Sequence, residues 1–322
     1  MLTCASFFSG VGGIDLGFKR SGFKTIYANE FDGFAADTFE CNFNLKVDRR
    51  DVNNVPTEDI PDFDIMLAGF PCQAFSIAGY RQGFDDEKGR GNLFFQMTRI
   101  IKEKKEKGVQ PRICFFENVK NLVTHDKGNT FKVICNELDK LGYKTVYKVM
   151  NACEYGNVPQ NRERIYIVAF RDSADYEKFT LPEPIKLDKT ISDVINFDDT
   201  VDTKYYYKKS SCYFYDQLTE HALSHNTIYQ WRRVYVRENK SNLVPTLTAN
   251  MGTGGHNVPI ILTNDGQYRK ITPRECFKVQ GFPSDFVLPE QSNAKLYKQA
   301  GNSVVVPIIA RIAEHIKVAI KE

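Results

Sequence analysis

The chain carries the segment FFSGVGGIDLGF at residues 7–18, and this segment indicates the class of fold. A strand-like run leads into Gly10, Gly12 and Gly13, and a helix-like run follows. Glycines allow close backbone approach to a ligand and leave amide groups free at a helix start. A second predicted strand ends near Glu30, where a carboxylate can accept hydrogen bonds from a ribose diol. The spacing departs from G-x-G-x-x-G, so it favours a small adenosyl ligand over a dinucleotide; a tight turn without ligand is the alternative.

Short apolar runs alternate with helix-like stretches through the first 170 residues. This order predicts an α/β fold with a doubly wound, mostly parallel sheet. The apolar spacing predicts helices at 93–107 and 130–141, and the charged run 102–107 is interpreted as the solvated end of the first. Strands are predicted at 6–9, 25–30, 64–68, 113–117, 145–150 and 164–170.

The alternation stops after about residue 180. The segment Leu181-Pro182-Glu183-Pro184 is typical of a linker. Residues 185–290 are rich in Tyr, Asn, Thr and Gly and predict a smaller, irregular second domain. Residues 303–320 return to a helical pattern, and we expect this helix to pack on the first domain. The predicted domains are therefore 1–184, completed by 291–322, and 185–290.

Cys72 follows the apolar run 65–68 and is predicted to lie on the turn after a strand. In open α/β sheets, ligands bind at that edge of the sheet. Gly69 permits a tight turn, and Pro71 fixes φ immediately before the cysteine. Cys72 is therefore a candidate nucleophile, because a thiolate attacks electrophilic carbon well. The alternative is a small buried apolar residue.

Composition limits the remaining choices. The eight cysteines form no C-x-x-C pair, so neither a zinc knuckle nor a dithiol redox site is indicated. Their scatter fits reduced thiols and a cytoplasmic protein. No signal peptide and no apolar run of about 18 residues is visible, so no membrane segment is predicted. A net charge of +3 does not by itself indicate a nucleic-acid partner.

Taken together, the motifs resemble those of the bacterial cytosine-C5 DNA methyltransferases, the methylases of type II restriction–modification systems. The resemblance covers almost the whole chain in the order of the family's motifs. It implies a Rossmann-like sheet that binds S-adenosylmethionine, with a smaller target-recognition domain at 185–290. The matching segments are FSGVGG at 8–13, NEFD at 29–32, GFPCQ at 69–73, ENVKN at 117–121, QNRERIY at 160–166, REC at 274–276, QGFP at 280–283 and GNSV at 301–304.

The resemblance also implies catalytic roles. Cys72 would add as thiolate to C6 of a cytosine, and Glu117 would hydrogen-bond the base and supply a proton at N3. Arg162 and Arg164 match a pair of arginines, of which one is expected at the cytosine O2 and the other near the pocket and backbone. The simpler alternatives are a helix-starting carboxylate at Glu117 and a solvated pair of loop arginines.

Cofactor residues are carried over in the same way. Asp48 is an alternative to Asp51, and Asn302 with Ser303 could instead cap the last helix. The positions that match S-adenosylmethionine contacts are Phe8, Gly10, Gly12, Glu30, Phe31, Asp51 and Asn302, and Phe70 and Leu93 are expected to line the same pocket.

The implied substrate is double-stranded DNA from which a cytosine is flipped into the pocket. Between Tyr229 and Arg274 there are seven Lys or Arg residues against Glu238 and Asp265, an excess that fits phosphate contact. Gln230, Arg232, Arg233 and Arg237 are candidates for reading base edges. The family also implies a restriction endonuclease as partner, and a monomer is usual in it. The basic residues are 232, 233, 237, 240, 269, 270 and 274.

Three alternatives remain at this point. A tRNA cytosine-C5 methyltransferase of the same fold shares the catalytic set, although the sizeable variable domain and the Pro-Cys-Gln context at 71–73 favour DNA. A glycine-loop oxidoreductase would leave Cys72, Glu117 and the arginines without a role. A catalytically silent DNA-binding relative disagrees with an intact Cys72 and Glu117.

Overall fold

The computed structural model describes residues 1–71, 93–252 and 258–321, so Cys72 lies outside the described residues. The chain divides into two compact units. Unit 1 comprises Met1–Met150, Glu163–Glu183 and Ile308–Glu322, and unit 2 comprises Asn151–Arg162 and Pro184–Pro307. By packing, residues 151–162 and 291–307 thus belong to unit 2, whereas the functional division predicted above counts them with the catalytic domain. That functional division stays a prediction.

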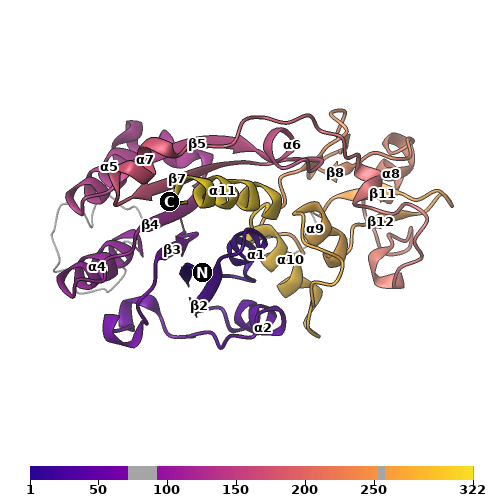
Figure 1. Ribbon diagram of the computed structural model, residues 1–322. Coiled ribbons are helices and arrows are strands. Elements are labelled where there is room, and N and C mark those ends of the chain that lie inside the picture. Colours follow the sequence, from indigo (N-terminus) through magenta and orange to yellow (C-terminus); the bar gives the residue numbers. More distant parts are fainter. Residues whose placement is uncertain (72–92, 253–257, 322) are drawn as a thin grey trace. The chain divides into compact units, whose positions relative to one another are not determined.

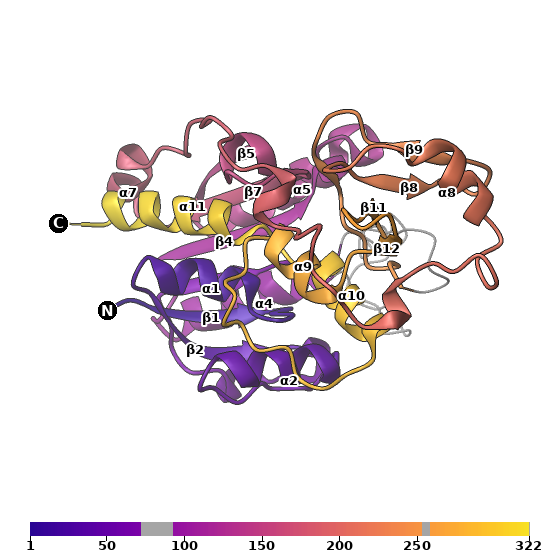
Figure 2. The ribbon, with the colours of Figure 1, turned by 90° about the vertical axis from the view of Figure 1, so that its right-hand side faces the viewer.

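Unit 1 is built on a six-stranded sheet with the order β2-β1-β3-β4-β7-β5 (Figures 1 and 2). The pairs β1–β2, β1–β3 and β3–β4 are parallel, and β7 runs antiparallel to β4. The predicted α/β class with a mostly parallel sheet is therefore confirmed. The strands are β1 (Thr3–Phe7), β2 (Lys24–Asn29), β3 (Ile65–Ala68), β4 (Ile113–Val119), β5 (Lys144–Asn151) and β7 (Glu163–Phe170).

Helices cover this sheet, and the last one packs on the first. A Cβ atom added at Gly17 of α1 would lie 2.4 Å from Cγ2 of Ile309, so only glycine lets α11 come this close. The Ser21 hydroxyl donates to the carbonyl of Ala310 at 3.0 Å, and both views show α11 beside α1 (Figures 1 and 2). The helices are α1 (Gly13–Arg20), α2 (Gly33–Asn42), α4 (Leu93–Glu106), α5 (Asn129–Lys140), α7 (Ser173–Lys178) and α11 (Val306–Ala319).

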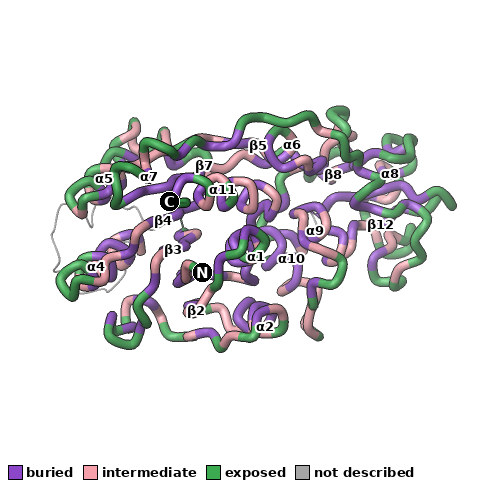
Figure 3. Tube along the Cα trace, viewed as in Figure 1, coloured by how far each residue is buried: buried purple, intermediate pink, exposed green. Residues whose placement is uncertain are grey.

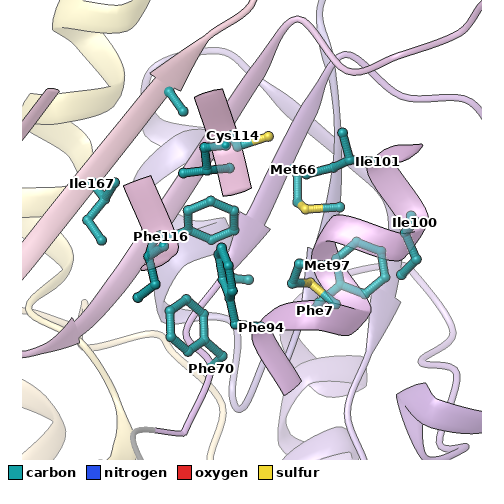
Figure 4. Packing of buried hydrophobic residues seen from close by; sticks show 14 of the residues in the cluster. Phe7, Met66, Phe70, Phe94, Met97, Ile100, Ile101, Cys114, Phe116 and Ile167 are labelled. Carbon is teal, nitrogen blue, oxygen red and sulfur yellow. The ribbon is translucent and has the colours of Figure 1, made fainter. Parts of the chain in front are cut away.

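The core of unit 1 lies between α4 and the central strands. Figure 3 shows the central strands largely buried, while α4 has both buried and exposed stretches. The ring of Phe70 packs against the rings of Phe94 and Phe116, with centroids 5.5 and 5.8 Å away (Figure 4). Such aromatic packing adds to the free energy gained by burial. The turn after β3 is thus anchored in the core immediately before Pro71 and Cys72.

Asp15 lies in the first turn of α1 and is fully buried. Its carboxylate accepts hydrogen bonds from the hydroxyls of Ser6, at 2.9 Å, and Thr25, at 2.8 Å. Burial disfavours the charged form and raises the pKa of Asp15 from 3.8 to about 6, because the hydroxyl hydrogen bonds offset only part of the desolvation.

Replacing Asp15 with asparagine is expected to change how stability depends on pH. Because the folded pKa lies above the unfolded one, this group stabilises the fold below about pH 4, and the contribution is lost as the pH rises through about 6. The loss amounts to about 3 kcal/mol. Urea denaturation from pH 4 to 7 should show a smaller decrease in unfolding free energy for Asp15→Asn than for wild type. Exposed Glu177→Gln is the control, and equal pH slopes for Asp15→Asn and wild type would contradict the assignment.

Unit 2 contains a four-stranded antiparallel sheet with the order β12-β11-β8-β9 and a two-stranded parallel pair, β10-β6. Aromatic residues form its core, where Phe214 stacks on Trp231 with centroids 4.5 Å apart. The strands are β6 (Gln160–Asn161), β8 (Tyr229–Trp231), β9 (Val236–Glu238), β10 (Val244–Pro245), β11 (Ile260–Leu262) and β12 (Tyr268–Lys270), and the helices are α6 (Ala152–Tyr155), α8 (Tyr215–His221), α9 (Pro273–Val279) and α10 (Asn293–Asn302).

The end of the chain corrects one sequence-based expectation. Asn302 ends α10 and Ser303 is the C-cap of that helix, whereas α11 begins at Val306. The alternative in which Asn302 and Ser303 cap the last helix is therefore wrong. The predicted helix 303–320 began three residues before α11, because an apolar helical pattern does not mark the short break between α10 and α11. Across the described residues, none of the helices is both long and apolar enough to cross a lipid bilayer.

Candidate active site

The glycine loop joins β1 to α1 and leaves open space at its tip. Gly12 has a φ of 86°, and a Cβ there would lie 2.3 Å from the ring of Phe43, so glycine is required on both counts. At Gly10, with a φ of 56°, an added Cβ would meet no atom of the described residues within 4 Å. Phe8 also adopts a positive φ, 53°, and the buried Ser9 hydroxyl has no hydrogen-bond partner within the described structure. An open loop with an unsatisfied hydroxyl fits a bound polar ligand.

Glu30 lies against this loop at the end of β2. One carboxylate oxygen accepts from the amide of Gly10 at 2.8 Å, and the other accepts from the amide of Asp32 at 2.7 Å. The next residue, Phe31, is 74% exposed, which is unusual for so large an apolar side chain. The structure thus places the predicted acidic residue beside the loop and an accessible aromatic face after it.

Asp51 and its alternative Asp48 have different surroundings. Asp51 is the N-cap of the 3-10 helix η1 (Val52–Asn54) and accepts from the backbone amide and side-chain amide of Asn53 at 2.9 and 2.8 Å. Asp48 accepts from Arg50 and from the Tyr27 hydroxyl, and the Arg50 hydrogen bonds are the main reason that its pKa is lowered. Asp48 is therefore committed to an ion pair, which favours Asp51 as the ligand-facing carboxylate.

The antiparallel pairing of β4 and β7 brings Glu117 and Arg164 together. Glu117 lies opposite Tyr166 and Arg164 lies opposite Val119, and the Arg164 Nε is 3.3 Å from Oε1 of Glu117. The side chains are only 11% and 15% exposed, so solvent screens this ion pair weakly. A Cβ added at Gly69 would lie 3.8 Å from Oε2 of Glu117, which puts the carboxylate beside the turn that leads to Cys72.

Asn118 is a residue that the sequence analysis missed. Its side-chain amide donates to the carbonyl of Phe70 at 2.8 Å, in a buried hydrogen bond between β4 and the turn after β3. The same side chain accepts from the amide of Val119 at 2.8 Å. Its place next to Glu117 in the ENVKN motif was the available signal. Asn118 fixes the backbone two residues before Cys72.

Arg162 belongs to unit 2, where its side chain forms hydrogen bonds with backbone carbonyls. Its guanidinium donates to the carbonyls of Leu247 at 2.7 Å, Gly301 at 3.1 Å and Ser303 at 2.6 Å. The residue is only 2% exposed. Of the two arginines predicted as a pair, Arg164 contacts Glu117 and Arg162 holds three backbone carbonyls, so the geometry favours a positioning role for Arg162.

Two buried glutamines, Gln160 and Gln280, extend the network of hydrogen bonds that Arg162 forms within unit 2. Gln160 donates to the side-chain oxygen of Gln280 at 3.1 Å and accepts from the amide of Leu247 at 3.3 Å. Gln280 in turn donates to the carbonyl of Ala300 at 2.9 Å. Four segments far apart in the sequence are therefore joined within unit 2. The last of them ends in Asn302, whose side chain is exposed.

Replacing Gly301 with alanine is expected to destabilise unit 2. An added Cβ would lie 2.2 Å from the carbonyl carbon of Thr248, and backbone cannot move aside as a flexible side chain can. Overpacking of this kind costs about 1–3 kcal/mol. Thermal and urea denaturation should show this loss for Gly301→Ala. Gly33→Ala is the control, because its nearest neighbour would be an Arg49 nitrogen at 3.9 Å; equal stability of both variants would contradict the clash.

Arg269 corrects the set of predicted phosphate contacts. It is fully buried, and its guanidinium donates to both oxygens of Glu275, at 2.9 and 2.8 Å. Glu275 also accepts from the amide of Thr272 at 2.7 Å in the capping box of α9. Arg269 is thus wrong as a DNA contact, because its charge is neutralised inside the unit. Arg232, Arg233, Arg237 and Lys240 are exposed.

Comparison with known proteins identifies the family. The profile of the C-5 cytosine-specific DNA methylase family matches residues 2–318. The chain is 58% identical over 317 residues to the type II methyltransferase M.Bsp6I of Bacillus sp. (strain RFL6), covering 98% of each chain. It is 38% identical over 320 residues to the type II methyltransferase M.HhaI of Haemophilus parahaemolyticus, covering 96% of this chain and 92% of the relative. The structure of the Entamoeba histolytica methyltransferase EhMeth has the same fold, with a TM-score of 0.74 at 20% identity, over 100% of this chain and 99% of that one. The chain therefore belongs to the C-5 cytosine-specific DNA methylase family.

Proposed function

We propose that this enzyme methylates C5 of a cytosine flipped out of a short double-stranded DNA sequence, through a covalent bond between Cys72 and C6. The observation that carries the proposal is the pair of Glu117 and Arg164 beside the turn that leads to Cys72, in a chain of this family. A cytosine in a duplex hides C5 and C6 in the base stack, so the reaction requires base flipping. A role beside a restriction endonuclease of the same site is part of the proposal.

Cys72, Glu117 and Arg164 take part in the reaction in different ways. Cys72 adds as thiolate to C6, and Glu117 supplies a proton at N3, which relieves the negative charge that the addition creates. Arg164 donates to the cytosine O2 and holds the carboxylate of Glu117. C5 then becomes nucleophilic, and S-adenosylmethionine supplies the methyl group. A water molecule then takes the C5 proton, Cys72 leaves C6 as thiolate, and the N3 proton returns to Glu117, which releases 5-methylcytosine.

The residues around the glycine loop fit S-adenosylmethionine. The open tip at Gly10 leaves room for the ligand, and Glu30 beside it can accept from the ribose hydroxyls. The exposed ring of Phe31 offers a face for stacking on adenine. The carboxylate of Asp51 can accept a hydrogen bond from the adenine amino group. Phe8, Gly12, Leu93 and Asn302 stay predicted contacts. Phe70 is 2% exposed, so we propose that it meets the ligand through its backbone.

The hairpin of β8 and β9 is the proposed DNA contact of unit 2. Trp231 pairs with Val236, and the amide of Arg232 donates to the carbonyl of Tyr235 at 2.9 Å, which closes a tip of residues 232–235. Exposed arginines at 232, 233 and 237 supply positive charge for phosphates. Val234 is 78% and Tyr235 50% exposed, so the tip also presents apolar surface.

Removing the three hairpin arginines is expected to weaken DNA binding and its dependence on salt. Each lost phosphate contact lowers the slope of log K against log salt by about 0.9. Fluorescence anisotropy at several salt concentrations should show this for the Arg232→Gln, Arg233→Gln, Arg237→Gln triple variant. The control removes three exposed lysines of unit 1, as Lys102→Gln, Lys107→Gln and Lys132→Gln. Equal slopes for the two triple variants would argue against the hairpin as a contact.

Two measurements test the function itself. Bisulfite sequencing of plasmid from cells expressing the protein should show protected cytosines in one short sequence context. Transfer of labelled methyl groups in vitro should favour duplex DNA over tRNA. Labelling of tRNA without DNA would establish the alternative substrate, and no labelling of either would overturn the proposal.

A further inference from the structure

Arg99 on α4 is bonded through all five of its N–H donors. The Nε donates to Gln96 at 2.7 Å, and one terminal nitrogen donates to the Thr57 hydroxyl at 3.0 Å and to Glu103 at 3.4 Å. The other terminal nitrogen donates to the carbonyls of Val55 at 3.0 Å and Val52 at 3.4 Å. A guanidinium has five donors in a fixed fork, whereas a lysine ammonium has three on a flexible stem.

Three of these acceptors belong to residues 52–57, the segment that begins at Asp51. Val52 and Val55 are buried in the same core cluster as Met97 and Ile100 of α4. Apolar packing is not directional, so it holds the segment on α4 without fixing its rotation. The two carbonyl bonds and the hydroxyl bond of Arg99 fix that rotation. Asp51, as N-cap of the turn that contains Val52, is oriented with it.

We propose that Arg99 is a positioning residue for the cofactor: it holds the 51–57 segment so that the Asp51 carboxylate meets the adenosyl end of S-adenosylmethionine. This inference rests on the proposed function, in which Asp51 accepts from the adenine amino group. Arg99 itself contacts no reacting atom. Its loss should therefore weaken cofactor binding and leave the chemical step nearly unchanged.

Lys104 provides a matched control on the same helix. It is only 3% exposed, although the sequence analysis interpreted residues 102–107 as a solvated helix end. Its ammonium donates to the carbonyl of Ile60 at 2.7 Å and to Asp62 at 2.6 Å, so it also ties α4 to a preceding segment. That segment lies beyond Thr57 and carries none of the predicted cofactor contacts.

The experiment compares cofactor affinity in Arg99→Lys, Lys104→Met and Asp51→Ala by isothermal titration calorimetry with S-adenosylmethionine. Arg99→Lys and Asp51→Ala are expected to weaken binding about tenfold, because small displacements of a contacting group are costly. Lys104→Met should bind like wild type. Steady-state kinetics should show a raised KM for S-adenosylmethionine in Arg99→Lys with kcat within about twofold, a split that general destabilisation would not produce.

The outcomes separate the inference from the function on which it rests. Wild-type affinity for S-adenosylmethionine in Asp51→Ala would overturn the assigned adenosyl contact and the inference with it. The methyl-transfer assay on duplex DNA would still test the proposed function separately. Weak binding in Asp51→Ala with wild-type binding in Arg99→Lys would overturn the inference alone. In the double variant Arg99→Lys, Asp51→Ala, the Arg99 substitution should cause no further loss of cofactor affinity beyond that of Asp51→Ala. Fully additive losses of affinity would count against a positioning role. If Arg99→Lys does not fold, Thr57→Val, which removes one acceptor, replaces it with the same expected direction.

Discussion

Replacing Cys72 with serine is expected to abolish methylation while S-adenosylmethionine still binds with wild-type affinity. The thiolate is a far better nucleophile than a neutral hydroxyl, and without the bond to C6 the C5 position of cytosine does not become nucleophilic. Cofactor binding should persist, because the proposed cofactor residues of unit 1 other than Phe70 lie on other segments, and the substitution leaves Phe70 itself unchanged. Methyl transfer from labelled cofactor to duplex DNA and calorimetric titration measure the two effects.

Cys41→Ser is the matched control, since Cys41 is an exposed free cysteine and should be dispensable. A duplex with 5-fluorocytosine gives a second readout. Fluorine at C5 cannot leave as a proton does, so the bond between Cys72 and C6 should persist and be seen as a DNA–protein adduct in denaturing gels. Substantial turnover by Cys72→Ser, or an adduct formed by that variant, would rule out the thiolate role.

Most of the strands and helices of unit 1 could be predicted from the sequence, because each has a clear pattern of apolar residues within its own segment. Strand β4 (Ile113–Val119) begins with the apolar run 113–116 and is buried at nearly every position, which is typical of a central strand. Helix α4 has a clear apolar stripe. The prediction of a mostly parallel sheet held because the crossovers between β1, β3 and β4 contain helical segments. The antiparallel insertion of β7 beside β4 is set by tertiary pairing, and no pattern within Glu163–Phe170 specifies it.

The environment of individual polar residues was less predictable. The local sequence does not distinguish Arg269 from Arg232 as DNA contacts. In the structure, Arg269 is buried in an ion pair with Glu275, whereas Arg232 is exposed. Lys104 was predicted to be solvated because it lies in the charged run 102–107, but it is buried, with contacts to Ile60 and Asp62. In each case a partner outside the local sequence decides, and a single sequence does not reveal long-range partners. Motif order assigned Glu117 and Arg164 to one site, and the structure brings their side chains together because both lie on strands that pair directly. Their catalytic roles stay predictions.

Replacing Glu117 with glutamine is expected to lower the rate of methylation by a factor of about a hundred or more. The amide keeps the size of the side chain but cannot give a proton to N3, so the charge created by addition to C6 is no longer relieved. It also removes the negative partner of Arg164, whose Nε lies 3.3 Å from the carboxylate. Single-turnover kinetics at saturating DNA and cofactor measure the chemical step directly, and DNA affinity should change little.

Glu163→Gln separates proton donation from a general loss of negative charge near β4 and β7. Glu163 adjoins Arg164 in the chain, and its carboxylate accepts from Lys120 at 2.9 and 2.8 Å on an exposed surface. Exposed ion pairs contribute little, so this variant should retain a near-normal rate. Equal losses in the two variants would mean that charge balance, not a proton from Glu117, limits the reaction. A near-normal rate in Glu117→Gln would remove Glu117 from the chemistry, and the buried pair with Arg164 would then serve only to hold β4 against β7.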